Sequence, residues 1–127
     1  MTFAGREMTD ERFRKSARLR LQAEFDRVHA SRTFAADEVL VVRACRNGLD
    51  WSRLGILVSK RVGGAVARNR WKRLIREAFR RSRGEIPPGL DLLVRPRQGA
   101  DADFLAVRRS LVRLCGRIAA RLGKGRA

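Results

Sequence analysis

The polar triplet Arg68-Asn69-Arg70 follows two glycines, Gly63 and Gly64, and opens a segment with helical periodicity. The backbone N–H groups in the first turn of a helix lack intrahelical partners, and together with the helix dipole they favour an anion. Two guanidinium groups at the same place add charge-assisted donors for phosphate. The Asn69 amide both donates and accepts hydrogen bonds, so it either reads a base edge or only bonds to the local backbone. The triplet therefore predicts a phosphate or base-edge site.

The helix that this triplet opens is predicted for residues 65–83. Its apolar side chains fall on one arc of a helical projection and its basic side chains on the opposite arc. The apolar arc holds Trp71, Leu74, Ile75, Ala78 and Phe79, and the polar arc holds Asn69, Lys72, Arg73, Arg76, Arg80 and Arg83. Glu77 is the only acid against eight Arg or Lys residues from Arg68 to Arg83. Like charges at i,i+4 spacing destabilise a helix by roughly a few tenths of a kcal/mol each, so this pattern favours a phosphate-binding face over a merely solvated one.

Positive charge also dominates the chain as a whole. Its 127 residues include 30 Lys and Arg against 13 Asp and Glu, which gives a formal net charge of +17. A domain with this much like charge repels itself, and a polyanionic partner relieves the repulsion. Composition alone leaves two alternatives open: a basic surface without a partner, and a basic amphipathic helix that lies on an anionic membrane.

Residue types for metal binding or nucleophilic catalysis are sparse. Cys45 and Cys115 are far apart and form no Cys-x-x-Cys pair, and His29 is the only histidine. We therefore expect no catalytic residue, no bound metal and no cofactor held by the protein. The sequence shows neither the apolar core of a signal peptide nor an apolar run near the ~20 residues of a membrane span. The expectation is a cytoplasmic protein with reduced thiols and no membrane contact.

The elements around the basic helix are short. We expect a helix at residues 22–31, strands at 39–44, 52–59 and 90–95, and a last helix that Asp103 caps. In the strand at 52–59, one face holds Leu54, Ile56 and Val58 and the other holds Gly55, Leu57 and Ser59. These elements predict one α+β domain at residues 19–122, in which helices pack on a small sheet as a two-layer sandwich. A flexible basic tail (1–18) and a C-terminal tail (123–127) flank it. The strand-helix-strand unit would cross over with the usual right-handed sense.

Residues 54–80 resemble the bacterial ribonuclease P protein family. The resemblance is carried by a strand that ends in Ser59-Lys60-Arg61-Val62-Gly63 and by the helix that begins with Arg68-Asn69-Arg70. Weaker similarity extends over roughly residues 18–114. The family's fold implies the order α-β-β-β-α-β-α, as in one domain of a small-subunit ribosomal protein, with a left-handed β-α-β crossover. On this point we follow the resemblance over the general rule.

The resemblance also implies a function. The holoenzyme of this family removes the 5′ leader of precursor tRNA, and its large RNA subunit does the chemistry with bound Mg2+. The protein is then a non-catalytic subunit whose partners are ribonuclease P RNA and precursor tRNA, with no obligate protein partner. The implied contacts to the RNA subunit are Arg68, Asn69, Arg70, Lys72, Arg73 and Arg76. The implied cleft for the single-stranded leader, between the first helix and the sheet, holds Phe25, His29, Ser59, Lys60 and Arg61.

The sequence departs from the family pattern inside this cleft. His29 stands where many relatives have a second aromatic, and it either stacks on a base or packs at the edge of the core. Phe25 belongs either to the core or to the cleft, and residues 39–43 offer no clear match for the strand aromatic. Two rival functions are a structural RNA-binding protein of ribosomal type and a double-stranded-DNA-binding module. Neither requires the two linked motifs.

Overall fold

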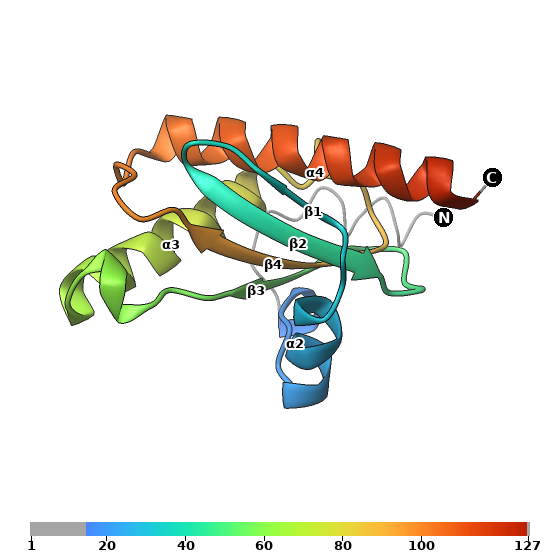
Figure 1. The fold of residues 1–127 in the computed structure, drawn as a ribbon, viewed down its shortest axis with the longest axis horizontal. Coiled ribbons are helices and arrows are strands. Elements are labelled where there is room, and N and C mark those ends of the chain that lie inside the picture. The colour runs from blue at the N-terminus through green and yellow to red at the C-terminus, as the bar shows by residue number, and fades with distance from the viewer. Residues whose placement is uncertain (1–14, 127) are drawn as a thin grey trace.

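The computed structural model describes residues 15–126 and shows one mixed four-stranded sheet between helices (Figure 1). The elements in chain order are the 3-10 helix η1 (Lys15–Ala17), α2 (Gln22–His29), β1 (Phe34–Ala36), β2 (Leu40–Arg46), β3 (Arg53–Ile56), the 3-10 helix η2 (Lys60–Val62), α3 (Ala65–Arg81), β4 (Leu90–Pro96) and α4 (Phe104–Arg126). Helices α3 and α4 cover one face of the sheet, and α2 lies against the other. The predicted α+β class and element order are confirmed.

The strands lie in the order β1-β2-β4-β3. The central pair, β2 and β4, is antiparallel, whereas β3 and β4 are parallel and are joined through α3, as the β-α-β prediction requires. The edge strand β1 pairs with β2 from Phe34 to Ala36. It was not predicted from the residues, because three residues with two alanines carry little β-propensity.

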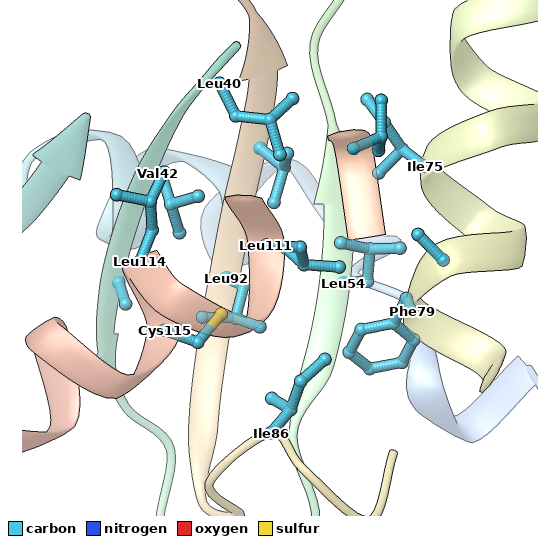
Figure 2. Close-up of a cluster of buried hydrophobic side chains, with 14 of the residues drawn as sticks. Leu40, Val42, Leu54, Ile75, Phe79, Ile86, Leu92, Leu111, Leu114 and Cys115 are labelled. Atoms are coloured by element: carbon cyan, nitrogen blue, oxygen red, sulfur yellow. The ribbon is translucent and has the colours of Figure 1, made fainter. Parts of the chain in front are cut away.

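The side chains of β3 alternate between the two faces of the sheet, as predicted, and each face carries its own apolar cluster. Leu54 is buried in the main core beneath α3 and α4, which also contains Leu40, Val42, Ile75, Phe79, Leu92, Leu111 and Leu114 (Figure 2). Gly55 faces α2, where Leu19, Val28 and Leu93 form a second, smaller cluster. The large core holds α3 rigidly, and the small one leaves α2 dependent on further contacts.

Local signals explain where the predicted elements begin and end. Strand β3 ends at Ile56, earlier than expected, although the Leu57 N–H still donates to the Val94 carbonyl at 3.0 Å. The chain then turns into η2, where the Ser59 hydroxyl caps the helix by accepting the Arg61 N–H at 3.3 Å. Gly63 then has a φ of +150°, a region that side chains disfavour, and a Cβ there would lie 2.9 Å from that of Ala67. Asp103 caps α4 as predicted, since its Oδ2 accepts the Ala106 N–H at 2.9 Å.

The domain extends beyond the predicted limits at both ends. Ala17 is buried and Arg18 forms a bridge with Leu54, so residues 15–18 pack on the domain rather than belonging to a tail. The Trp51 indole N–H donates to the Ser16 carbonyl at 2.9 Å. Helix α4 continues to Arg126 through most of the predicted C-terminal tail. The predictions for residues 1–14 and 127 lie outside the described residues.

One carboxylate joins α4 to the turn between β1 and β2. Asp37 accepts the N–H groups of Val39 and Leu40 at 2.9 and 3.0 Å, and it also accepts from the Ser110 hydroxyl and Arg113 on α4. Burial by itself raises the pKa of Asp37, but the hydrogen bonds from Leu40, Arg113, Val39 and Ser110 outweigh it and lower this pKa from 3.8 to about 2. The ionised form therefore stabilises the fold.

We expect Asp37→Asn to lower the free energy of unfolding near neutral pH by about 2 kcal/mol, the equivalent of the pKa shift. Because the folded pKa lies below the unfolded value, this stabilisation is complete above pH 3.8 and is lost as the pH falls toward 2. Urea denaturation across this range measures it. A variant that keeps the wild-type acid sensitivity would contradict the assignment.

Candidate nucleic-acid interface

Helix α3 presents the predicted basic face to solvent. Of its predicted inner arc, Trp71, Ile75, Ala78 and Phe79 are buried and Leu74 is only partly buried, while Asn69, Arg70, Arg73 and Arg76 are exposed. Glu77 forms ion pairs with Arg80 and Arg81 at the C-terminal end, and hydrogen bonds from both hold its pKa at about 2. None of the ion pairs among the described residues involves Arg68, Arg70, Lys72, Arg73 or Arg76. The N-terminal half of α3 thus carries positive charge without neutralising partners inside residues 15–126.

Helix α3 has Gly64 as its N-cap and begins with Ala65, Val66 and Ala67, so the Arg68-Asn69-Arg70 triplet starts at the fourth helical residue rather than opening the helix as predicted. The Arg68 N–H already donates to the Gly64 carbonyl at 2.9 Å. The Arg68 Nε atom is buried and has no hydrogen-bond partner among the described residues. Arg70 reaches across to the Ala102 carbonyl before α4, with Nη2 at 3.4 Å from the oxygen. Asn69 is exposed and makes no side-chain hydrogen bond within residues 15–126, so local backbone bonding, one of the two predicted roles, is not seen. Its amide is available to a ligand.

The strand register defines the sheet face on the α2 side. Side chains of cross-strand partners form three rows on this face. The first row holds Cys45, Asp91 and Arg53, and the second holds Phe34, Arg43, Leu93 and Gly55. The third row holds Ala36, Val41, Arg95 and Leu57. Helix α2 packs over the first row and part of the second. In the third row Arg95 is exposed and Leu57 is 40% exposed. Val41 in this row is buried and Ala36 is only partly exposed, so the uncovered part of the row is its end at Arg95 and Leu57. That end leads along β3 into the Ser59-Lys60-Arg61 segment.

Phe25 on α2 packs where β3 has no side chain. A Cβ on Gly55 would lie 2.7 Å from Phe25 Cε1 and 2.9 Å from Leu19 Cδ1, so the ring occupies the space that the glycine leaves. Phe25 is only partly buried: one part of it packs against the smaller cluster, and the rest is accessible. His29, one helical turn later, is exposed rather than packed at the core edge.

The other predicted cleft residues lie at the far end of β3. Lys60 and Arg61 are exposed on η2, which precedes α3 and packs against it. The Ser59 hydroxyl oxygen already accepts the Arg61 N–H as the cap of η2. A ligand at the predicted Ser59 contact would therefore bind the same hydroxyl group. The Ser59-Lys60-Arg61 segment thus links the uncovered end of the third row to the triplet of α3.

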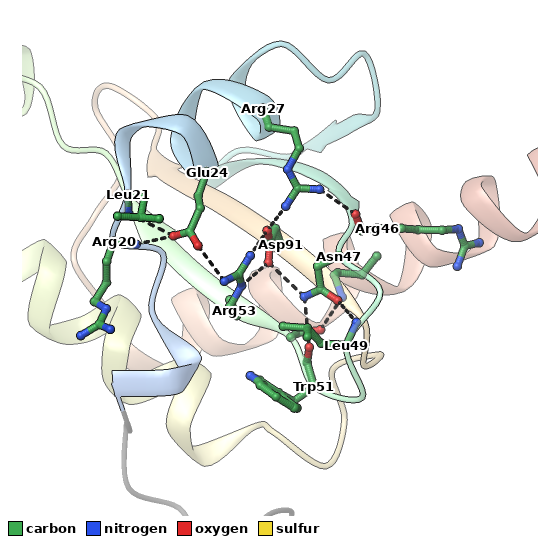
Figure 3. A network of polar contacts seen from close by, with 12 residues as sticks. Arg20, Leu21, Glu24, Arg27, Arg46, Asn47, Leu49, Trp51, Arg53 and Asp91 are labelled. Atoms are coloured by element: carbon green, nitrogen blue, oxygen red, sulfur yellow. Dashed lines mark hydrogen bonds and ion pairs between the residues drawn. The ribbon is translucent and has the colours of Figure 1, made fainter.

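A buried carboxylate that the sequence analysis missed fixes α2 on this face (Figure 3). The Asp91 side chain is 0% exposed and accepts from Arg53 Nε at 2.8 Å, from Arg53 Nη2 at 2.7 Å, from Asn47 Nδ2 at 3.0 Å and from Arg27 on α2. Arg53 also pairs with Glu24 at 2.8 Å, and Glu24 accepts the N–H groups that precede α2. Hydrogen bonds to Asp91 raise the pKa of Arg53. The only signal in the sequence was one acid inside the apolar strand Leu90–Pro96.

Thiols and metal-binding groups offer little further chemistry within residues 15–126. Cys45 and Cys115 are free thiols, and burial raises the pKa of Cys115 to about 12. Within residues 15–126, no three His, Cys, Asp or Glu side chains gather where they could hold a metal ion. None of the described helices combines the length and the apolar composition needed to cross a membrane.

The chain is similar to known proteins over most of its length. The sequence model of the family described as Ribonuclease P matches residues 13–119. The ribonuclease P protein component of Thermotoga maritima is 42% identical over 113 residues, which cover 85% of this chain and 97% of that protein. That of Brevibacillus brevis is 41% identical over 105 residues, covering 81% and 83%.

Solved structures agree with this match. The ribonuclease P protein from Thermotoga maritima superposes with a TM-score of 0.71 at 40% identity, covering 79% of this chain and 96% of that one. The protein from Staphylococcus aureus gives a TM-score of 0.70 at 38% identity, covering 80% and 94%. Sequence and fold thus point to the same relatives.

The Asp91 network generates a prediction about stability. Asp91→Ala should lower the free energy of unfolding by about 3–5 kcal/mol, because it leaves the guanidinium of Arg53 partly buried without its carboxylate. Asp91→Asn should cost less, since it keeps an acceptor. The exposed Asp50→Ala variant is the matched control and should change stability by no more than about 0.5 kcal/mol. Equal urea midpoints for the Asp91 and Asp50 variants would rule out the anchoring role.

Proposed function

This chain belongs to the ribonuclease P protein family, and from that premise we propose that it is the RNA-binding protein subunit of a ribonuclease P that matures the 5′ end of tRNA. The observation that carries the proposal is the unneutralised basic half of α3 beside an uncovered, partly aromatic sheet face. The first surface suits a folded RNA, and the second suits an unpaired strand. We place this activity in the cytoplasm.

Helix α3 is the proposed contact with ribonuclease P RNA. The contacting residues are Arg68, Asn69, Arg70, Lys72, Arg73 and Arg76. The guanidinium groups bind phosphates in bidentate fashion, and the exposed Asn69 amide offers the donor and acceptor that a base edge needs. The first-turn N–H groups of Ala65, Val66 and Ala67 lie at the amino-terminal end of this face, where they favour an anion. Phosphates here also offset the repulsion between the like charges of the helix.

The single-stranded leader of precursor tRNA is proposed to lie along the uncovered part of the sheet face beside α2. The accessible part of Phe25 and the exposed His29 offer rings on which unpaired bases stack. Lys60 and Arg61 hold the backbone of the leader near the start of α3, with the Ser59 cap beneath them. Because this path ends at the triplet, one protein surface orients leader and RNA subunit relative to each other.

The protein contributes binding and not bond cleavage in this proposal. The RNA subunit and its bound Mg2+ perform the hydrolysis, and the residues of this chain position the substrate. The basic surface also lowers the repulsion between two polyanions, so that less free Mg2+ is needed for their association. Precursor tRNA and ribonuclease P RNA are the proposed partners, without an obligate second protein.

The proposal predicts reconstitution. Purified chain added to bacterial ribonuclease P RNA at low Mg2+ should restore leader removal, whereas Arg68→Ala/Arg70→Ala should restore it poorly. The double variant should bind the RNA more weakly, and the slope of log affinity against log salt should fall by about 1 per arginine that contacts a phosphate. Arg46→Ala/Arg117→Ala, which removes two exposed arginines elsewhere, is the charge-matched control. Equal slopes for the two double variants would refute the role of the triplet.

The leader path predicts a loss of discrimination. His29→Ala should reduce the preference of the holoenzyme for precursor over mature tRNA without affecting the fold, because His29 is exposed. Phe25→Leu, which keeps apolar volume over Gly55 but removes the ring, should reduce it further. A stacked base is worth about 1–3 kcal/mol, so a five- to hundredfold loss is expected in equilibrium binding. If Phe25→Leu is folded and still discriminates like the wild type, Phe25 serves only in packing.

A further inference from the structure

An exposed aromatic side chain lies on the sheet face outside the predicted cleft residues. Phe34 is in the edge strand β1 and is 45% exposed. It pairs across the strands with Arg43, whose guanidinium carbon lies 5.2 Å from the centre of the Phe34 ring. The guanidinium lies over the Phe34 ring, so the pair combines an exposed apolar ring with a positive charge.

This pair is held in place from several sides. Arg43 Nη1 donates to the Ser31 carbonyl, just after α2, at 2.9 Å. From α4, Arg121 donates to the backbone carbonyl of Phe34. Arg43 takes part in none of the ion pairs found within residues 15–126, so no carboxylate of that region neutralises it. The ring and the guanidinium are therefore preorganised, and the charge is available.

The pair belongs to the same face as the proposed leader path. Phe34 and Arg43 are in one row with Leu93 and Gly55, and Phe25 packs over Gly55 at the other end of that row. The ends of a four-strand row are about 14 Å apart, three strand spacings of ~4.8 Å. A stacking group at each end of the row gives a strand that crosses this face two separate places to bind.

We propose that Phe34 and Arg43 form a second base-binding site, at which an unpaired nucleobase of the leader stacks on the Phe34 ring. The guanidinium N–H groups of Arg43 that Ser31 leaves free bind the adjoining phosphate. Aromatic and arginine planes are the groups on which single-stranded RNA stacks, and the positive charge selects a polyanion over an apolar protein surface. The site rests on the proposed function and extends it to the β1 edge of the sheet.

The test measures the affinity of reconstituted holoenzyme for precursor tRNAs whose leaders are shortened one nucleotide at a time. Phe34→Leu should weaken binding of the longest leader about tenfold, and the loss should vanish below a certain leader length and for mature tRNA. Phe34→Tyr, which keeps the ring, should bind like the wild type. The leader length at which the loss vanishes should differ from that for His29→Ala, because the two sites lie apart. Leu105→Ala, another exposed apolar residue at 60% exposure, controls for surface changes.

The outcomes separate this site from the leader path itself. The second base site is overturned if Phe34→Leu binds every leader as tightly as the wild type does. It is also overturned if Phe34→Leu loses as much affinity for mature tRNA as for precursor tRNA. If wild-type holoenzyme does not prefer precursor over mature tRNA, the proposed leader path fails, and this site fails with it. A preference that persists while Phe34→Leu has no effect overturns only the Phe34 site.

Discussion

The buried carboxylate of Asp91 is the contact on which the α2 side of the molecule depends. Helix α2 has eight residues, too few to be stable alone, and its apolar cluster is small. Arg27 and Arg53 connect the helix to Asp91, and Glu24 ties its first turn to the same network. This network sets the angle at which Phe25 meets Gly55. The ion pairs of Asp91 thus determine how α2 and Phe25 lie on the sheet, although the surface that they form is partly apolar.

The opposite layer is built on a different principle. Helices α3 and α4 share a large apolar core with the sheet, and burial of that core stabilises this layer without the exposed basic side chains of α3. Trp71, Ile75 and Phe79 hold α3 from beneath, so its outer face is free to carry unneutralised arginines. Stability comes from one arc of the helix, and the proposed RNA contact from the other. The separation lets a strongly charged chain keep a defined fold.

Much of the fold could be predicted from the sequence because its signals are local. Periodicity located α3, the glycines located its start, and alternation assigned Leu54 and Gly55 to opposite faces. The predictions failed where contacts join distant residues. Asp91 meets Arg27 across 64 positions, and the three-residue strand β1 exists only through its pairing with β2. For the same reason Phe34 was missed as a surface aromatic, and the packing of Phe25 over Gly55 could not be predicted.

The placement of Glu77 has a kinetic consequence. Because this acid pairs with Arg80 and Arg81, the charge of α3 is partly neutralised near its C-terminal end and is not neutralised in its N-terminal half, where the positive end of the helix dipole also lies. The electrostatic potential is therefore graded along the helix axis. A diffusing polyanion is drawn first to the amino-terminal end, and its encounters with the protein are oriented before any specific contact forms. Productive collisions are thereby selected over the many possible approaches to a protein of net charge +17.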